Sequence, residues 1–317
     1  MAWQPATRGS VLAAALLGLA ACAARTPPPA AGCELFVLGV AQDGGLPQLG
    51  CEQPCCVSAR ASGRLLYPAC LGVVVHATGG LLLVEATPQI EPQVALLHQL
   101  AGVQGRGRRP VDAVLLTHAH IGHYLGLASF GREVAATAAL PTWCSARMAA
   151  FLRTNGPWSQ LVALQQLALH EVAPRTMFTP LPGLEVTAIP VPHRDEFSDT
   201  LAFQLRGPQR TVLFVPDIDA WSNAPLLQEL LHGVDIAYVD GTFFDGSELP
   251  DRDLAEIRHP LMTDTMQRLA EFAARRPGAV RFLHLNHSNP ALHDRSVRER
   301  IERAGFAVAE QGERVVL

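Results

Sequence analysis

The 317-residue chain contains no lysine, so all 25 of its Lys and Arg positions are arginine. The absence of lysine excludes Schiff-base chemistry and a phosphate-binding loop of the kind that requires a lysine. The net charge of −4 gives no electrostatic basis for binding nucleic acid. The sequence also lacks internal repeats and low-complexity breaks after its N-terminal region. Because 49% of the residues are hydrophobic, we expect one domain with a sizeable core.

The apolar run near the N-terminus, residues 11–19, is too short to span a bilayer. It follows Arg8 and ends in Leu19-Ala20-Ala21-Cys22, a layout typical of a secretory signal. Leu-Ala-Ala-Cys also resembles a bacterial lipobox, in which cleavage precedes a lipidated cysteine. An ordinary signal peptide with a coincidental cysteine is the alternative. We therefore predict a signal peptide (1–21), lipidated Cys22 with a flexible tether (22–32), and a domain (33–317) exported to the periplasmic side of a bacterial membrane.

Three histidines, His118, His120 and His123, lie within six positions directly after a strand-like apolar run, 111–116. Histidines that only form hydrogen bonds in a core or on a surface would explain one of them, but explain three at this spacing poorly. Imidazole is a common metal ligand, so the spacing favours a metal site.

Three further candidate ligands follow strand-like runs later in the chain: His193, Asp217 and His284. Taken alone, His193 is typical of a loop, and Asp217 of a turn or a helix cap. The recurrence of a potential ligand at the end of each run favours a shared metal site.

The order of these motifs resembles the metallo-β-lactamase superfamily, whose signature is His-x-His-x-Asp-His followed by a histidine, an aspartate and a histidine. The resemblance covers residues 34–317 and implies a four-layer α/β/β/α sandwich. It also implies two metal sites. His118, His120 and His193 would hold one metal with a position open for water, as a catalytic zinc requires, and His123, Asp217 and His284 would hold the second.

Hydrophobic patterns support this fold by predicting strands and helices along the chain. The expected strands are 34–40, 71–76, 81–86, 111–116, 184–190, 200–205, 211–215, 236–239 and a last one leading to His284. The expected helices are 89–101, 145–155 and 158–166, and Gly79-Gly80 is expected to form a hairpin turn.

Gly122 stands where the superfamily signature has aspartate. Loss of that carboxylate predicts a second site that binds its metal more weakly, holds a different metal, or takes an oxygen ligand such as Asp219. A single zinc is sufficient in principle, because it can lower the pKa of its water to about 7, with Asp217 orienting or deprotonating that water. A degenerate site that binds without turnover is the alternative. Restoring aspartate at position 122 is then expected to raise turnover if the pocket still supports hydrolysis.

Three cysteines, Cys51, Cys55 and Cys56, lie within six residues of a glycine-rich segment and resemble a structural zinc knuckle that is one ligand short. The superfamily subgroup that contains pyrroloquinoline quinone biosynthesis protein B and the phosphodiesterase of phosphonate breakdown implies His287 as the fourth ligand. Disulfides are the alternative, with Cys51 pairing with Cys55 or Cys56, and Cys33 with Cys70. Cys144 is interpreted as a small buried hydrophobic residue.

Four further segments resemble the corresponding parts of the same subgroup: 42–45, 240–243, 259–260 and 286–290. By this resemblance His259 would face the metal pocket, contacting substrate or acting as an acid; alternatively, it begins a helix beside Pro260. Asp240 and Asp245 are interpreted as turn residues or as hydrogen-bond partners of the ligand histidines.

These features predict a membrane-tethered, metal-dependent hydrolase, with zinc as the expected metal at one or two catalytic positions and one structural position. Iron or manganese could replace zinc, because imidazole accepts several metals. The expected substrate is a small ester, lactone, amide or phosphodiester, and no nucleic-acid partner is expected. An oxidative enzyme with a redox metal and a lipoprotein that binds metal or ligand without catalysis are the alternatives.

Overall fold

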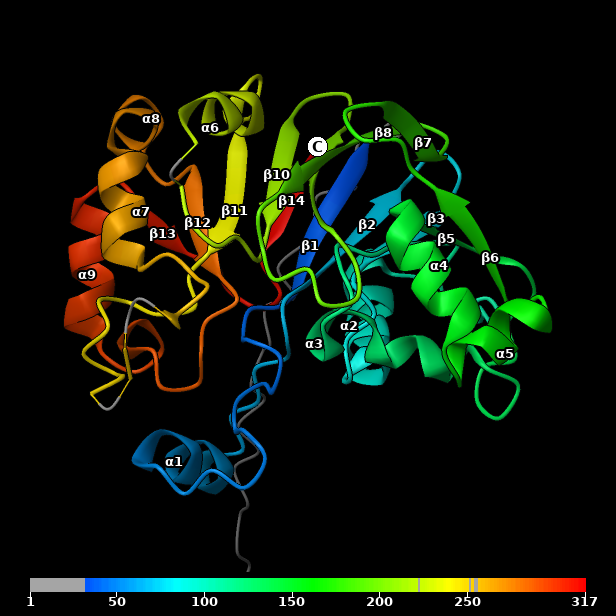
Figure 1. Cartoon of the computed structure of the whole chain (residues 1–317), viewed down its shortest axis with the longest axis horizontal. Helices are drawn as coiled ribbons and strands as arrows, with labels where there is room; N and C mark the ends of the chain where they lie inside the picture. Colours follow the sequence, from blue (N-terminus) through cyan, green and yellow to red (C-terminus); the bar gives the residue numbers. More distant parts are fainter. Residues whose placement is uncertain (1–31, 222, 251, 254–255) are drawn as a thin grey trace, which may run out of the picture.

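The structure of the protein is a computed structural model that describes residues 32–221, 223–250, 252–253 and 256–317 (Figure 1). The predicted signal peptide, Cys22 and nearly all of the tether lie outside these described residues. None of the described helices is both long enough and apolar enough to cross a membrane.

Two seven-stranded mixed sheets form the centre of the domain (Figure 1). The first has the order β14 (Arg314–Val316), β1 (Cys33–Gly39), β2 (Cys70–Val75), β3 (Gly80–Val84), β4 (Ala113–Leu115), β5 (Leu140–Cys144) and β6 (Leu167–Glu171). The second has the order β13 (Ala307–Val308), β12 (Val280–Leu283), β11 (Ile236–Asp240), β10 (Thr211–Val215), β9 (Thr200–Arg206), β8 (Leu184–Val191) and β7 (Met177–Leu181).

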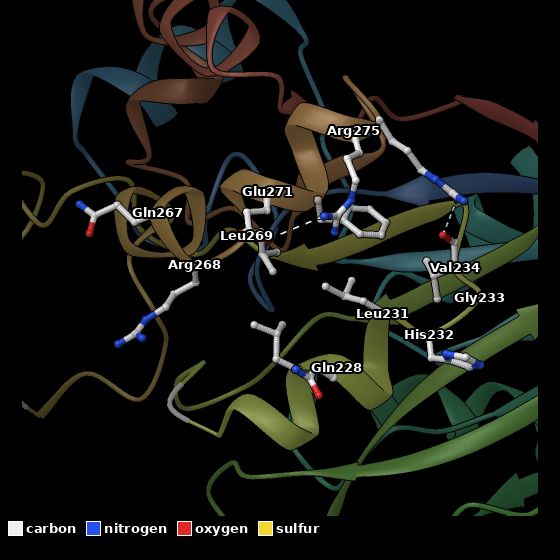
Figure 2. Close-up of a pocket in the computed structure, with 13 residues that line it drawn as sticks. Gln228, Leu231, His232, Gly233, Val234, Gln267, Arg268, Leu269, Glu271 and Arg275 are labelled. Atoms are coloured by element: carbon white, nitrogen blue, oxygen red, sulfur yellow. Dashed lines mark hydrogen bonds and ion pairs between the residues drawn. The ribbon is translucent and has the colours of Figure 1, made fainter.

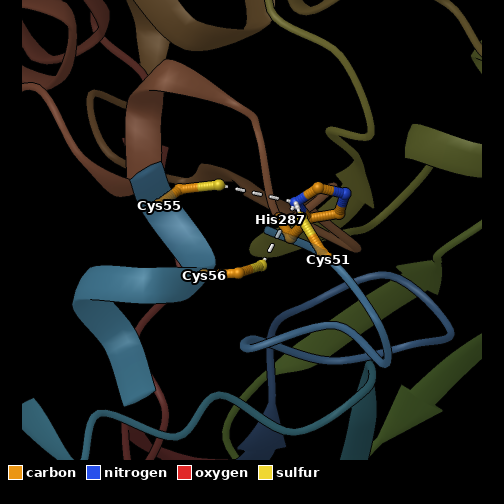
Figure 3. A group of neighbouring side chains, drawn as sticks. All are labelled: Cys51, Cys55, Cys56 and His287. Carbon is orange, nitrogen blue, oxygen red and sulfur yellow. Dashed lines mark hydrogen bonds between the residues drawn. The ribbon is translucent and has the colours of Figure 1, made fainter. Parts of the chain in front are cut away.

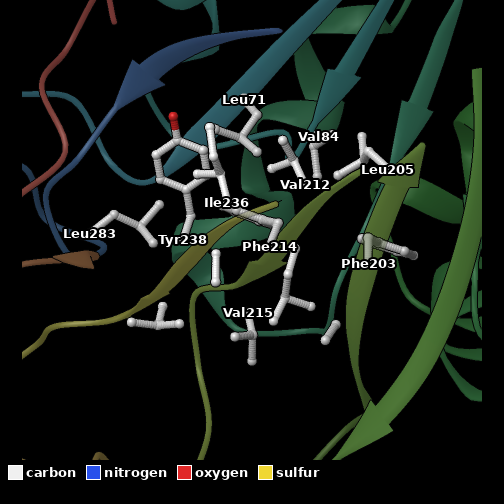
Figure 4. Packing of buried hydrophobic residues seen from close by; sticks show 14 of the residues in the cluster. Leu71, Val84, Phe203, Leu205, Val212, Phe214, Val215, Ile236, Tyr238 and Leu283 are labelled. Carbon is white, nitrogen blue, oxygen red and sulfur yellow. The ribbon is translucent and has the colours of Figure 1, made fainter. Parts of the chain in front are cut away.

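The two sheets pack face to face through a continuous apolar core (Figure 4). Leu71 and Val84 of the first sheet belong to the same buried cluster as Phe203, Phe214 and Tyr238 of the second. Full burial of an aliphatic or aromatic side chain of this size contributes about 1.5–3 kcal/mol. The largest buried side chains therefore hold the sheets together and fix the edge on which the site is built.

Helices cover the outer face of each sheet (Figure 1). Those against the first sheet are α2 (Ile90–Ala101), α3 (Ile121–Tyr124), α4 (Ala146–Thr154) and α5 (Trp158–Ala163). Those against the second are α6 (Ala224–Leu231), α7 (Met262–Arg268), α8 (Ala270–Arg275) and α9 (Arg295–Arg303). The predicted four-layer α/β/β/α fold is therefore confirmed.

Most of the predicted elements are found within one or two residues of their expected ends. The helix expected over 158–166 ends at Ala163, because Gln165 adopts a left-handed conformation (φ 55°) that leads into β6. Several elements were not predicted: strands β5, β6, β7, β13 and β14, and helices α1 (Pro54–Ser62), α3 and α6 to α9. In α1, Pro54 stands in the first turn, where its missing N–H costs no helical hydrogen bond.

Strand directions gather several carboxyl ends at one edge of the molecule. Strands β3 and β4 are parallel neighbours, as are β10, β11 and β12. Strand β1 is antiparallel to β2, which is antiparallel to β3, so β1 runs in the same direction as β3. By the same reasoning through β9, strand β8 runs in the same direction as β10. Residues that directly follow these strands therefore meet at a common edge.

Candidate metal centre

Each predicted metal ligand follows one of these strands, so distant parts of the sequence converge. His118, His120 and His123 follow β4, while His193, Asp217 and His284 follow β8, β10 and β12. Five of these six residues are buried, with exposed fractions of 1–5%: His118, His123, His193, Asp217 and His284.

One cluster contains three imidazoles, as the sequence predicts. The candidate ligand atoms of His118, His120 and His193 all lie within 4.8 Å of one another. Nε2 of His118 is 2.8 Å from Nδ1 of His120. A set of three nitrogens in this arrangement suits a catalytic zinc site, in which the fourth position admits water or substrate.

A second cluster lies beside it and shares Asp217. Oδ2 of Asp217 is 3.1 Å from Nε2 of His123 and 3.5 Å from Nε2 of His284. Its other oxygen, Oδ1, is 3.6 Å from Nε2 of His193. Asp217 thus directs one oxygen toward each cluster, which is the geometry needed to bridge two cations.

The chemistry of the buried atoms fits a cation. Nε2 of His123, His193 and His284 and Oδ2 of Asp217 are buried and have no hydrogen-bond partner among the described residues. Buried polar atoms without partners are costly, and nearly all such atoms in native proteins are satisfied. A metal ion coordinated by these atoms would satisfy them together.

The pKa shifts in the site agree with this interpretation. Burial, followed by the neighbouring His123, lowers the pKa of His118 well below its ordinary value and keeps the ring neutral, as a metal ligand must be. Burial opposes ionisation of Asp217, but His284 and His123 outweigh it and hold the pKa of the carboxyl well below its ordinary range. The ionised carboxylate supplies a negative charge that a cation would neutralise.

Two threonines fix the orientation of ligand histidines through buried carboxylates. Thr117 Oγ1 donates to Glu85, so the same oxygen can accept from Nδ1–H of His118 at 2.8 Å. Thr242 Oγ1 likewise donates to Asp240 (2.7 Å) and lies 3.0 Å from Nδ1 of His284. In each case Nε2 keeps its lone pair for the cluster.

We expect Thr242→Val to weaken metal binding by about 10- to 100-fold, the usual cost of losing an outer hydrogen-bond partner of a ligand histidine. The hydroxyl of Thr242, which is completely buried, would be replaced by a methyl group of similar size. Zinc affinity measured by competition with a chelator checks the prediction. Thr242→Ser retains the hydroxyl and should restore affinity; equal affinity in Thr242→Val and the parent would contradict the role.

Asp219, a predicted replacement for the missing oxygen ligand, lies on the far side of a ligand ring. Its Oδ1 lies 3.2 Å from Nδ1 of His193, opposite the nitrogen that faces the cluster. Glu196 takes the corresponding place beside His120, at 3.0 Å from Nε2. Both carboxylates are therefore positioned to orient histidines.

The sequence interpretation missed Asp43, which lies in the loop after β1. Oδ1 of Asp43 is 3.3 Å from Nε2 of His123 and 3.5 Å from Nε2 of His284. The side chain is 42% exposed, yet Oδ1 itself is buried and accepts no hydrogen bond among the described residues. Asp43, His123 and His284 thus form a further group of potential ligands. Segment 42–45 resembles the superfamily subgroup, but this resemblance alone predicts no ligand role for Asp43.

His259 faces the clusters instead of beginning a helix, since α7 starts only at Met262. Its ring centre lies 5.3 Å from that of His193, and its Nδ1 is 2.8 Å from Oδ2 of Asp240. Burial lowers the pKa of His259, but Asp240 and then Asp217 outweigh this effect and raise it to about 9. Asp240 is therefore a partner of site histidines, whereas Asp245 accepts from the backbone N–H of Ser247 in a turn.

The three clustered cysteines converge on His287 (Figure 3). The Sγ atoms of Cys51, Cys55 and Cys56 lie 3.8, 3.6 and 3.5 Å from Nδ1 of His287. Three thiols and one imidazole make a donor set that structural zinc uses. The structure thus brings together all four residues of the predicted structural site.

The alternative disulfide between Cys33 and Cys70 is wrong. Cys33 pairs with Val75 across β1 and β2, whereas Cys70 pairs with Gly39 at the opposite end of the same ladder. Such a separation is too large for a disulfide. All six cysteines of the described residues are free, and Cys144 is buried as predicted.

A cavity of about 300 Å³ opens beside His259. Three arginines line it, Arg194, Arg252 and Arg258, together with Gln42 and Asn286. A separate hollow of about 620 Å³, lined by α6 and α8, includes none of the predicted site residues (Figure 2). The cavity beside His259 is therefore placed to receive a substrate at the clusters, as is a larger hollow of about 830 Å³ that His259, Asp219 and Trp221 also line.

Comparison with known proteins agrees with the geometry. The sequence profile described as beta-lactamase superfamily domain matches residues 82–284, more than half of the chain. The chain belongs to this superfamily.

Within it, the chain is 28% identical over 305 residues to coenzyme PQQ synthesis protein B of Methylobacterium nodulans, covering 88% of this chain and 98% of that protein. The protein of the same name from Xanthomonas oryzae pv. oryzae is 28% identical over 311 residues, covering 90% and 100%. The predicted resemblance to this subgroup of the superfamily is confirmed.

Solved structures of the superfamily have the same fold. The crystal structure of Zn(2+)-bound PqqB from Methylobacterium extorquens aligns with a TM-score of 0.76 at 23% identity, covering 90% of this chain and 100% of that chain. A diphosphatase from the PhnP family aligns with a TM-score of 0.65 at 20% identity, covering 90% and 97%.

Proposed function

We propose that the protein is a metal-dependent hydrolase that acts on a small substrate. The observation that carries the proposal is the convergence of three histidines, His118, His120 and His193, beside the ionised carboxylate of Asp217. When bound there, a divalent metal would polarise the scissile bond and lower the pKa of a water molecule to about 7.

The protein's own side chains orient the water and supply a proton. Asp217 is placed to orient the attacking water, and the low pKa of its carboxyl keeps it ionised. His259 carries a proton at neutral pH, lines the substrate cavity, and is placed to donate to the leaving group. Asp240 holds the ring of His259 in position through its hydrogen bond to Nδ1.

The arginines of the cavity support a substrate that bears a negative charge. The side chains of Arg194 and Arg258 are 46% and 61% exposed, so they can reach a bound anion. Guanidinium groups bind phosphate and carboxylate oxygens with paired hydrogen bonds. Among the substrate classes considered, a phosphodiester, or an ester, lactone or amide with an attached carboxylate, fits best.

The decisive experiment compares the metal-free protein with protein reloaded with zinc, on matched anionic and neutral substrates of each bond type. Zinc-dependent hydrolysis that favours the anionic substrates is expected. A second candidate is the oxidative enzyme that the subgroup resemblance implies, and the similarity to coenzyme PQQ synthesis protein B supports membership of that subgroup. Substrate-dependent oxygen consumption with bound iron, without zinc-dependent hydrolysis, would favour this candidate over hydrolysis.

We also propose that the protein is exported and held on the periplasmic side of a membrane through lipidated Cys22. Replacing Cys22 with Ser is expected to move the protein from the membrane fraction to the soluble fraction, because the acyl chains contribute about 0.8 kcal/mol per buried methylene. Cell fractionation and radiolabelled palmitate incorporation check this prediction. A Cys22→Ser variant that stays in the membrane fraction would contradict it.

A further inference from the structure

Gly122 leaves the superfamily signature one carboxylate short, and the structure shows what fills the space. A Cβ atom built on Gly122 would lie 1.9 Å from Oδ1 of Asp43, 2.5 Å from its Cγ and 2.8 Å from its Cα. Contacts this short cannot form without movement of the Asp43 backbone. Asp43 therefore occupies the volume into which a side chain at position 122 would project.

The Asp43 carboxylate approaches the metal-facing nitrogens of the ligand histidines. Carboxylates that only orient a ligand histidine contact its other ring nitrogen. For His123 that place is already taken by Glu85, 3.3 Å from Nδ1, and for His284 it is taken by Thr242. Asp43 instead lies near Nε2 of both rings, on the same side as Asp217.

The backbone holds Asp43 in this position from both sides. The N–H of Gln42 donates to the carbonyl of Leu285 (2.8 Å), next to His284, and Nδ2 of Asn286 donates to Oε1 of Gln42 (2.6 Å). The N–H of Gly45 closes a turn onto the carbonyl of Gln42 (2.7 Å), with Gly45 at a φ of 68° that favours glycine. The loop is thus tied to the strand end that carries His284.

We infer that Asp43 is the carboxylate ligand of the second metal, supplied by the loop after β1 in place of the aspartate absent at position 122. The second site then consists of His123, His284, Asp43 and bridging Asp217, two nitrogens and two carboxylates, a set that suits zinc, manganese or iron. The inference rests on the proposed function, because it requires that the histidine clusters bind metal. It replaces the expectation that aspartate at position 122 would raise turnover, since that side chain would collide with Asp43.

The test is a metal titration of the full-length protein with Co²⁺, followed by its visible absorption spectrum, and with Zn²⁺ by calorimetry. Absorption by cobalt bound to thiolates reports the cysteine cluster separately. Asp43→Asn keeps the shape of the side chain and removes its charge. It is expected to retain the metal of the three-histidine cluster and to weaken the second metal at least about tenfold. Glu52→Gln, an exposed carboxylate in the same loop, is the matched control and should bind as the parent does.

A substitution at position 122 gives an independent outcome. Gly122→Ala is expected to weaken the second metal, because its Cβ would meet Oδ1 and Cα of Asp43 at 1.9 and 2.8 Å and displace the loop that presents the carboxylate. Unchanged binding of the second metal in Asp43→Asn or in Gly122→Ala would overturn the inference while leaving the proposed hydrolase intact. A parent protein that binds no metal at the histidines would overturn both.

Discussion

Replacing His118 with Ala is expected to abolish hydrolysis. The fall in kcat/KM should exceed about 100-fold, which is the largest usual effect of removing a residue that only hydrogen-bonds to a ligand histidine. His118 belongs to the three-histidine cluster, and burial, with His123 next, keeps its ring neutral. Its removal leaves two nitrogens and takes away the ligand that the Glu85–Thr117 pair holds in place. Metal content by mass spectrometry and steady-state kinetics on the same preparation check both parts of the prediction.

The matched control is His232→Ala, which removes a histidine that lines the separate hollow of Figure 2. It should keep the metal content and the kinetic constants of the parent. A His118→Ala protein that remains folded, loses metal and loses activity together supports a catalytic metal. Full activity after loss of the metal would show that the cluster has no part in the reaction.

The sequence was sufficient for the fold and for the ligands that follow strands. Parallel strands with their carboxyl ends at one edge bring His118, His193, Asp217 and His284 together, and each of these residues ends an apolar run that is visible without a structure. The outer strands were harder to predict. Strand β6 follows a short helix without a break in hydrophobic pattern, and β5 contains Pro141, a residue that usually argues against a strand.

The site residues that the sequence did not predict, Asp43 and Glu85, have roles that depend on their position in the folded structure. Glu85, which directly follows β3, has a φ of 76°, a backbone conformation that is costly outside glycine and that the apolar pattern of the strand does not predict. Asp43 lies 79 positions before Gly122, and no local pattern links a missing side chain to the distant loop that fills its place. Such compensation becomes visible only when side-chain volumes are placed in space.

The segment that carries Asp43 also carries the cysteine cluster, so the two metal sites are physically connected. Its own apolar core is small: Leu46, Cys56 and Ala59 form its buried cluster, with Leu66 packed against it. Full burial of the largest of these side chains, Leu46, contributes about 1.5–3 kcal/mol to folding. Structural zinc contributes on the order of 10 kcal/mol in small zinc-binding peptides. The metal is therefore expected to dominate the local stability of this segment.

We accordingly expect Cys55→Ala to lose one zinc per chain and to open residues 42–66 to limited proteolysis, while the two-sheet core stays folded. Because Asp43 would lose its fixed position, the second metal of the histidine clusters should also bind more weakly. Cys144→Ala is the matched control, since burial raises the pKa of that thiol to about 12 and it lies in the core of the first sheet. Zinc content, protease digestion and Co²⁺ titration of both variants give the comparison. Cleavage of the parent segment triggered by a reductant but not by a chelator would instead show that the cysteines act through a disulfide.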